Sequence, residues 1–233
     1  MEIKGSVALV TGANRGLGRR FAAALLERGA AKVYAAARNP ESVDLPGVIP
    51  IRLDVTDPES VRAAAEVASD VTLLVNNAGS STGASLLNGP LEDIRLEMDT
   101  HYFGTLTVTR AFAPVLERNG GGAVLNVLSV LSWVTYPPVA AYSAAKSAAW
   151  SLTNALRQEL APQKTQVTAL HVGYMDTDMA AHVDGPKSDP AVVAGLALDG
   201  VEQRRFEVLG DELSRGVQAG LAGGAAALYP QLV

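Results

Sequence analysis

The stretch VALVTGANRGLG, which runs from Val7 to Gly18, decides the fold. Its apolar start, Val7–Val10, has the length of a buried strand, and an amphipathic helix is expected from about Leu17 to Arg28. A strand, a glycine turn and a helix N-terminus together point backbone N–H groups at a phosphate. The spacing G-x3-G-x-G differs from the general dinucleotide fingerprint. A tight turn without a ligand is the alternative, but the strand before it and the βα pattern after it favour phosphate binding.

Strand-like runs alternate with helical patterns along the rest of the chain. This alternation predicts an α/β fold, namely a three-layer, doubly wound (Rossmann-type) parallel sheet with helices on both faces and right-handed crossovers. Pro50 indicates an edge strand, because proline has no N–H to donate. No repeat or linker is present, so residues 1–233 are interpreted as a single domain. Strands are expected at Val7–Val10, Lys32–Ala37, Val48–Leu53, Val71–Val75, Ala123–Leu128, Gln166–Val172 and Phe206–Leu209, and helices near 17–28, 58–69, 91–98, 99–118, 142–160, from Pro190, and in a short tail.

The amino-acid composition excludes several classes of partner and of chemistry. Of 233 residues, 48% are apolar and 18% charged, which is typical of a globular protein. A formal net charge of −5 argues against a nucleic-acid surface or an anionic membrane as partner. The absence of cysteine excludes disulfides and thiolate chemistry, and no metal site is expected. Without a signal peptide or spanning segment in the sequence, we expect a cytoplasmic protein.

The end of the second strand indicates the cofactor. In dinucleotide-binding folds an acidic residue near this point holds the ribose 2′-OH, whereas an arginine accommodates a 2′-phosphate. Here Ala37-Arg38 occupies the place, and Arg15 in the glycine turn lies where it could reach the same phosphate. Each arginine alone is more often a solvated charge, but the pair, without a carboxylate, predicts NADP(H).

Two further strand ends carry polar residues. Asp54-Val55 closes the third strand, where it could meet an adenine. Asn76 and Asn77 follow the fourth strand and lead into Ala78-Gly79. Paired asparagines there can be ordinary turn residues. They can also hold the crevice at the carboxyl ends of the strands, where open α/β sheets bind ligands.

Tyr142 and Lys146 stand four residues apart at the start of an alanine-rich helical pattern, so both lie on one helix face. An ammonium about 4.5 Å from a phenol would lower the tyrosine pKa by about three units, or roughly 4 kcal/mol. Such a phenol gives or takes a proton near neutral pH. The alternative is a packed ring beside a solvated charge.

With these motifs in their observed order, nearly the whole chain resembles the short-chain dehydrogenase/reductase family of nicotinamide-dependent oxidoreductases. The resemblance rests on the glycine turn, Asp54, the Asn-Asn-Ala-Gly run, Ser129, Tyr142-x-x-x-Lys146 and Gly173-x-x-x-Thr177. It implies that Tyr142 is the general acid or base and that Lys146 lowers its pKa and holds the nicotinamide ribose. Ser129 would hydrogen-bond the substrate oxygen, with Ser132 as a weaker candidate. The cofactor site implied by the resemblance comprises Gly12, Asn14, Arg15, Gly16, Leu17, Gly18, Arg38, Asp54, Val55, Asn77, Ala78, Gly79, Tyr142, Lys146, Gly173, Met175 and Thr177.

The chain departs from the family pattern at three positions. His101 stands where the family commonly has an asparagine that holds a water between the lysine and bulk solvent. We expect a neutral His101 imidazole to serve in this proton relay, with a packed helical histidine as the alternative. Val172-Gly173 replaces the usual Pro-Gly, which could loosen the turn under the nicotinamide. Leu128 replaces a common serine beside Ser129.

These observations predict an NADPH-dependent carbonyl reductase, reversible as an alcohol dehydrogenase, acting on a small hydrophobic or aromatic carbonyl compound. A non-catalytic NADP(H) sensor is the main alternative, and a dehalogenase-like lyase is a second. By resemblance we expect a homotetramer or homodimer formed through the helices 99–118 and 142–160. The expected substrate wall comprises Leu131, Trp133, Val134, Tyr136, Tyr174 and Met179.

Overall fold

Seven parallel strands form one sheet in the computed structural model, which describes residues 1–232. The strand order is β3-β2-β1-β4-β5-β6-β7. The strands are β1 (Val7–Thr11), β2 (Lys32–Ala37), β3 (Ile49–Arg52), β4 (Leu73–Asn76), β5 (Gly122–Val127), β6 (Thr165–His171) and β7 (Glu207–Leu209). The helices are α1 (Gly16–Glu27), α2 (Pro58–Val67), α3 (Leu91–Met98), α4 (Thr105–Arg118), α5 (Ala140–Glu159), α6 (Pro190–Glu202), α7 (Glu212–Gly220) and α8 (Gly224–Leu228).

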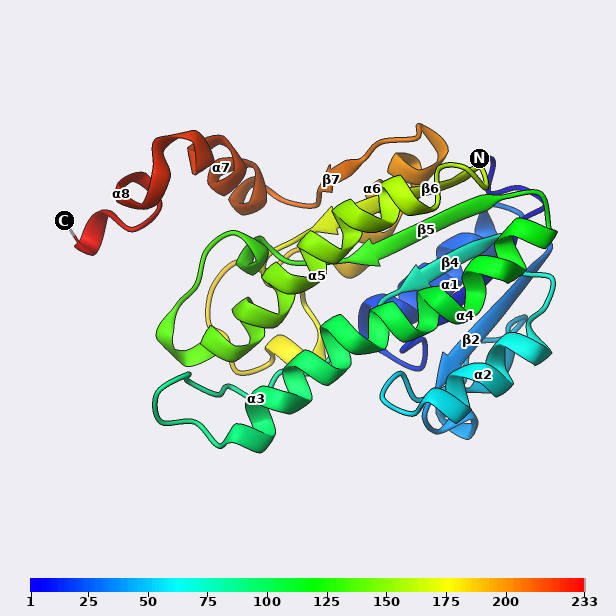
Figure 1. Ribbon diagram of the computed structural model, residues 1–233, viewed down its shortest axis with the longest axis horizontal. Helices are drawn as coiled ribbons and strands as arrows, with labels where there is room; N and C mark the ends of the chain where they lie inside the picture. Colours follow the sequence, from blue (N-terminus) through cyan, green and yellow to red (C-terminus); the bar gives the residue numbers. More distant parts are fainter. Residues whose placement is uncertain (233) are drawn as a thin grey trace.

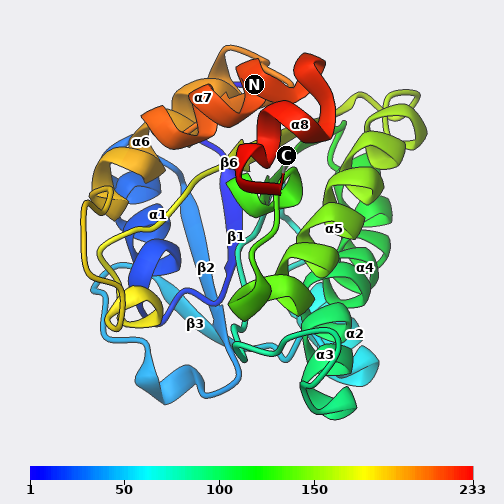
Figure 2. The same ribbon diagram turned by 90° about the vertical axis from the view of Figure 1, so that its left-hand side faces the viewer.

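Helices cover both faces of the sheet (Figures 1 and 2). On one face α1 and α6 pack together, with Phe21 and Leu198 among their fully buried residues. On the other face α2, α4 and α5 bury residues such as Phe112 and Leu156. The predicted three-layer, doubly wound arrangement is therefore confirmed.

The sequence of each strand matches its place in the sheet. Residues 8–11 of β1 are all buried, because both faces of a central parallel strand are covered. Three of the four residues of β3 are exposed, and β3 pairs with β2 alone. Pro50 therefore lies in an edge strand, as predicted.

The strand order reverses beside β1, which pairs with β2 on one side and with β4 on the other. Open α/β sheets bind ligands in the crevice at the carboxyl ends of the strands near such a switch point. Gly12 follows β1 and Asn77 follows β4, so the fold brings two of the sequence motifs together there.

A π-helical turn at Asp99–Gly104 joins α3 to α4, where the sequence predicted two separate helices. Residues 91–118 thus form one continuous helical segment with a widened turn in its middle. At this turn Gly104 lies close to Val55: a Cβ on Gly104 would come within 2.9 Å of a Val55 methyl group. π-Helical turns occur preferentially at functional sites, and this one carries His101.

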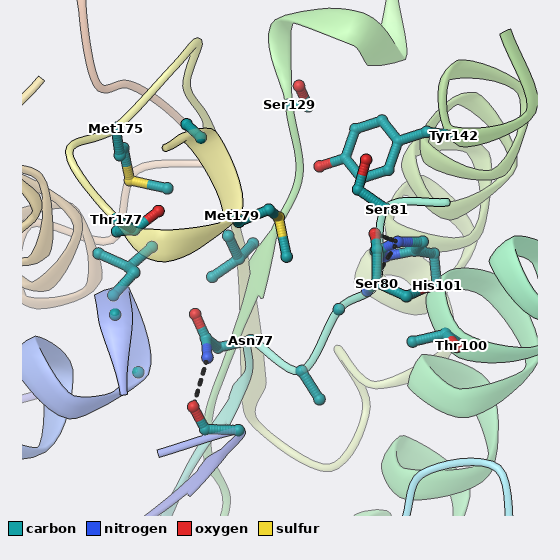
Figure 3. A pocket seen from close by; sticks show the side chains of 18 of the residues that line it. Asn77, Ser80, Ser81, Thr100, His101, Ser129, Tyr142, Met175, Thr177 and Met179 are labelled. Carbon is teal, nitrogen blue, oxygen red and sulfur yellow. Dashed lines mark hydrogen bonds between the residues drawn. The ribbon is translucent and has the colours of Figure 1, made fainter. Parts of the chain in front are cut away.

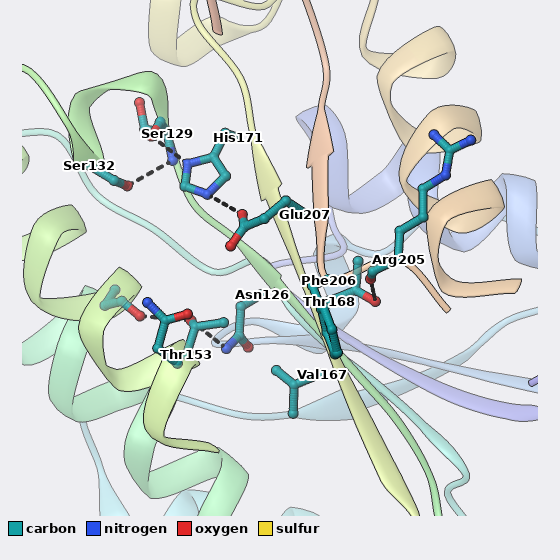
Figure 4. Close-up of polar contacts among 12 residues, drawn as sticks. Asn126, Ser129, Ser132, Thr153, Val167, Thr168, His171, Arg205, Phe206 and Glu207 are labelled. Atoms are coloured by element: carbon teal, nitrogen blue, oxygen red, sulfur yellow. Dashed lines mark hydrogen bonds and ion pairs between the residues drawn. The ribbon is translucent and has the colours of Figure 1, made fainter. Parts of the chain in front are cut away.

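A buried polar chain fixes α5 to the sheet, and Figure 4 shows its members Asn126 and Thr153. The Asn76 amide donates to Asn126 Oδ1 (2.9 Å) and to Thr109 Oγ1 (3.0 Å). Asn126 in turn donates to Thr153 Oγ1 on α5 (2.9 Å). The chain therefore connects β4 and β5 to both long helices, α4 and α5.

The end of the described chain packs back on the loop after β5. Val217, Leu228 and Tyr229 contact the buried Val130–Val134 cluster, and the Thr135 N–H donates to Tyr229 Oη (3.0 Å). Across residues 1–232 there is no helix whose length and apolar character would let it cross a membrane.

Candidate active site

One cavity of about 560 Å³ lies at the carboxyl ends of the strands (Figure 3). All residues that the resemblance assigned to a cofactor line it. The four predicted catalytic residues, Ser129, Tyr142, Lys146 and His101, line it too. The fold thus brings side chains from distant parts of the chain into a single cavity.

The glycine turn forms a narrow cradle between β1 and α1. Gly12 and Gly16 have positive φ values of 65° and 54°, which favour glycine. A Cβ on Gly18 would lie 2.1 Å from the Gly12 carbonyl oxygen, so no larger residue fits without movement. Arg15 precedes α1 and its side chain does not cap the helix. The first N–H groups of α1 therefore remain available to a phosphate.

Asn77 joins the ends of β1 and β4. Its side-chain amide donates to the Thr11 carbonyl (2.8 Å), and its backbone N–H donates to Thr11 Oγ1 (2.9 Å). The Ala78 N–H donates to the same hydroxyl (3.0 Å). Asn77 thus ties the end of β4 to the end of β1 at the switch point.

The edge of the cavity beyond β2 is positively charged. Arg38 lines the cavity and forms no ion pair with any residue in 1–232. Arg15 contacts Asp178 across the cavity mouth (3.2 Å), but both side chains are largely exposed, so this ion pair is weak. Asp54 turns its carboxylate toward Thr56, whose N–H and hydroxyl donate to it at 3.0 Å and 2.7 Å.

Ser129 is buried at the end of β5 and begins a short 3₁₀ turn. Its hydroxyl donates to the Val172 carbonyl (3.3 Å) and accepts from the Leu131 N–H (3.1 Å). Ser132 faces away from the cavity and accepts from the Ser129 N–H (3.4 Å). The geometry therefore favours Ser129 over Ser132, as the sequence did.

Lys146 is buried one helical turn after Tyr142 on α5. Its Nζ donates to the Val127 carbonyl (2.8 Å) and lies 5.5 Å from the centre of the Tyr142 ring. Burial lowers the pKa of Lys146 to about 8, against an opposing attraction from Glu97.

Tyr142 differs from the prediction made for its pKa. Its ring is partly exposed on the cavity wall. Burial and then the negative charge of Glu97 raise its pKa, and a hydrogen bond with Ser129 opposes them. The expected lowering by Lys146 was wrong for this structure, because the sequence argument omitted the loss of solvation and the buried carboxylate.

His101 lies on the π-helical turn with its ring edge against the Tyr142 ring, 4.9 Å between centres. Its Nε2 faces the Ser80 carbonyl (2.9 Å) and the Glu97 carboxylate (3.2 Å). Burial and then the charge of Lys146 lower the pKa of His101, so the predicted direction is confirmed. The sequence analysis missed Glu97, although its spacing of four residues before His101 on a helix was a usable signal.

A second buried histidine lies behind Ser129 (Figure 4). His171 Nδ1 faces the Ser129 carbonyl (3.1 Å), and Nε2 faces the Glu207 carboxylate (2.7 Å), which also pairs with Arg157. Each ring nitrogen therefore faces an oxygen from another part of the chain. The sequence analysis missed this cluster, because nothing local relates β6 to β7.

The apolar wall of the cavity is only partly the predicted one. Leu131, Tyr136, Tyr174 and Met179 line it, as expected. Trp133 does not: its ring stacks on His171 at 3.8 Å between centres.

Val134 does not line the cavity either, because it is buried beneath the C-terminal residues. The loop after β5 therefore uses these two side chains for packing.

The turn after β6 is firmly held in spite of its Val172-Gly173 sequence. The Gly173 N–H donates to Asp211 Oδ2 (2.6 Å), and the Val172 carbonyl accepts from the Val130 N–H (3.0 Å). Partners from distant segments hold this turn without proline, and the effect of the Val172-Gly173 sequence on its rigidity stays a prediction.

Comparison with known proteins agrees with this geometry. The model of the short chain dehydrogenase family matches residues 6–187. A short chain dehydrogenase from Burkholderia cenocepacia J2315, solved in complex with NADP, is 42% identical and superposes with a TM-score of 0.95, covering 100% of this chain and 99% of that one. Carbonyl reductase (NADPH) 2 from Sus scrofa is 34% identical over 84% of this chain and 81% of that protein.

A third relative is longer. The NADPH-dependent 1-acyldihydroxyacetone phosphate reductase of Schizosaccharomyces pombe is 33% identical over 193 residues, which cover 79% of this chain and 64% of that protein. This chain thus spans about two thirds of the length of that relative.

Proposed function

Because the chain belongs to the short-chain dehydrogenase family, we propose that it is an NADP(H)-dependent carbonyl reductase that can also run as an alcohol dehydrogenase. The observation that carries this proposal is the convergence of Ser129, Tyr142 and Lys146 in the cavity that also contains the glycine cradle. The substrate class that we propose is a small hydrophobic or aromatic carbonyl compound.

The residues around the cavity fit an NADP(H) molecule. The cradle at Gly18 admits no side chain, and the N–H groups of α1 are directed toward it. Arg38 supplies a positive charge at the end of β2, where a 2′-phosphate would lie, and the sequence has no carboxylate there. Two of the relatives described above carry NADPH in their names, and the Burkholderia structure contains NADP.

In the proposed reaction, the cofactor provides the hydride and the side chains of the protein provide the proton and a hydrogen bond. A bound nicotinamide supplies or accepts the hydride. Tyr142 gives its proton to the carbonyl oxygen during reduction, and the Ser129 hydroxyl donates a hydrogen bond to the same oxygen as negative charge develops there. The raised pKa of Tyr142 keeps the phenol protonated at neutral pH, which is the form that reduction requires.

The apolar lining of the cavity supports the substrate class. Leu131, Tyr136, Tyr174 and Met179 present mainly apolar surface to the cavity. Tyr136, Tyr174 and Met179 are between 42% and 48% exposed, so this wall remains accessible from solvent. Ligand pockets of this kind select apolar groups and orient them with a few polar contacts.

The experiment follows NADPH oxidation against a panel of aryl and alkyl ketones, with wild-type protein and with Tyr142→Phe. We expect turnover by the wild type and its loss in the variant, while NADPH binding measured by fluorescence stays nearly unchanged, because only the transferable proton is removed. Binding of NADPH without reduction of any ketone would favour a sensor. Substantial residual reduction by Tyr142→Phe would identify another acid, with Ser129 as the next candidate.

We also propose a homotetramer or homodimer. Phe103 is 51% exposed at the start of the helix that continues into α4, and Ala144 is exposed on α5. Ala145 and Ala149 are buried against the protein's own sheet, so only part of the alanine-rich face is available to a second copy. Light scattering at micromolar concentration tests this, and a monomeric mass would refute it.

A further inference from the structure

Glu97 is a fully buried carboxylate beside the proposed active site. It lies on α3, one turn before His101, and 0% of its side chain is exposed. Its Oε1 accepts from the Thr82 N–H (2.5 Å), and its Oε2 accepts from Ser80 Oγ (3.1 Å). The same oxygen lies 3.2 Å from His101 Nε2.

Among residues 1–232, no lysine or arginine contacts Glu97 directly. Burial by itself would raise the pKa of Glu97, but the hydrogen bonds from His101 and from the Thr82 N–H outweigh it and lower the pKa. Glu97 is therefore a charged group inside the protein. Burial of an ion is costly, so a buried charge is weak evidence for a contribution to stability. The buried charge of Glu97 therefore points to a role beyond stability.

The contacts of His101 define where its proton lies. Nε2 faces two acceptors, the Ser80 carbonyl (2.9 Å) and Glu97 Oε2 (3.2 Å), whereas the Ser80 N–H is farther away (3.4 Å). A nitrogen between two acceptors carries the hydrogen. The lowered pKa of His101 keeps the ring neutral, so Nδ1 bears a lone pair.

The lone pair of Nδ1 is directed into a tight part of the site. Nδ1 is buried and has no hydrogen-bond partner among residues 1–232. This edge of the ring faces Gly79, where a Cβ would come within 2.9 Å of His101 Cε1. Both Gly79 and His101 line the cavity, and Figure 3 shows where His101 lies.

We propose that Glu97 is a positioning residue that acts through His101: its carboxylate holds the imidazole proton on Nε2 and so presents Nδ1 as a hydrogen-bond acceptor beside Tyr142 and Lys146. This inference rests on the proposed reductase function. A carboxylate that selects one tautomer of a histidine is an established catalytic arrangement in other enzymes. Here it leaves Nδ1 of His101 free to accept a hydrogen bond.

A structural role for Glu97 makes different predictions. The carboxylate also anchors the segment from Ser80 to Thr82, so its loss would lower stability in either case. If Glu97 only anchors this segment, its substitution should leave the tautomer of His101 unchanged. The loss of turnover should then also be the same with and without His101.

The first experiment reads the tautomer directly by ¹⁵N NMR of protein labelled at histidine. The sequence has three histidines, so the signals are assigned by the losses seen in His171→Asn and His182→Asn. In the wild type we expect His101 to be protonated at Nε2 and unprotonated at Nδ1. In Glu97→Gln the amide oxygen keeps its bond to the Thr82 N–H, so the amide NH₂ faces Nε2 and shifts the ring toward the Nδ1-protonated tautomer.

The control is Glu92→Gln, the same substitution at an exposed position of the same helix, which should leave the His101 signals unchanged. Wild-type protein with the His101 proton on Nδ1, or a His101 spectrum that Glu97→Gln does not alter, would overturn the proposal. This readout needs no substrate, so it stands even if the protein reduces none of the ketones.

The second experiment is a double-mutant cycle on turnover. We expect Glu97→Gln to lower kcat about tenfold, below the range of a direct acid–base residue, with little change in the Kd for NADPH. In a His101→Asn background the same substitution should have no further effect, since the residue through which it acts is gone. Equal losses in both backgrounds, accompanied by a lower melting temperature, would show that Glu97 only anchors the loop.

Discussion

The buried ammonium of Lys146 should make stability depend on pH in a defined direction. Its pKa falls from the ordinary 10.5 to about 8 because burial disfavours the charge. At about 1.4 kcal/mol per pKa unit, the folded protein loses about 3 kcal/mol at neutral pH by keeping this group protonated. Substitution of Lys146 by methionine removes that cost, and also removes the hydrogen bond to the Val127 carbonyl.

The sign follows from proton uptake. Below pH 8 the folded and unfolded chains both hold the Lys146 proton, so the stability difference between wild type and Lys146→Met is constant. Between pH 8 and pH 10.5 the folded wild type has released the proton while the unfolded chain retains it, so wild-type stability rises with pH. From pH 6.5 to pH 9.5 we expect the wild type to gain about 2 kcal/mol relative to Lys146→Met.

Thermal unfolding of both proteins at these two pH values measures the change. For a chain of this length, about 2 kcal/mol corresponds to a relative shift in melting temperature of about 4–8 °C. The comparison with Lys146→Met cancels the other groups that titrate, and Lys4→Met, an exposed lysine, is the matched control. If the stability difference between wild type and Lys146→Met is the same at both pH values, the reasoning about Lys146 is refuted.

Two further predictions concern the cofactor. Wild-type protein should prefer NADPH over NADH by at least tenfold in kcat/KM, which corresponds to about 1.4 kcal/mol. The double substitution Ala37→Asp with Arg38→Leu should reverse this preference. Equal use of both cofactors by the wild type would contradict the assignment. Gly18→Ala should weaken NADPH binding more than tenfold, because its Cβ would lie 2.1 Å from the Gly12 carbonyl oxygen, whereas Gly216→Ala, with open space around it, should leave binding unchanged. Titration of NADPH fluorescence compares the two, and an equal affinity for both variants would show that the cradle tolerates a methyl group.

Much of the fold was predictable because its signals are local. An apolar run indicates a buried strand, a proline indicates an edge strand, and clustered glycines indicate a tight turn. The structure places β1, β3 and the glycine turn as these local signals predict. The π-helical turn at Asp99–Gly104 was not predictable, because both helical patterns around it remain intact and only tertiary packing near Val55 distinguishes it.

The candidate site was predictable where a motif fixes the spacing of its residues. Tyr142, Lys146 and Ser129 fall in one cavity for that reason. The electrostatic surroundings of these residues were not predictable in the same way. The effect of Glu97 on the pKa of Tyr142 depends on burial, and the contact of His171 with Glu207 joins two strands that are distant in the sequence. Trp133 illustrates the same limit: its apolar character suggested a substrate wall, but His171 provides a better stacking partner inside the protein.

The anchoring of α5 gives this helix a fixed position along its own axis. Thr153 is tied to Asn126, Ser147 Oγ donates to the Ser132 carbonyl (2.9 Å), and Lys146 Nζ donates to the Val127 carbonyl. These three attachments span residues 146–153, about 10 Å of helix at 1.5 Å per residue. A displacement of α5 along its axis by one residue would therefore break all three hydrogen bonds together. A substitution at Thr153 should therefore misalign Tyr142, although the two side chains lie far apart on α5.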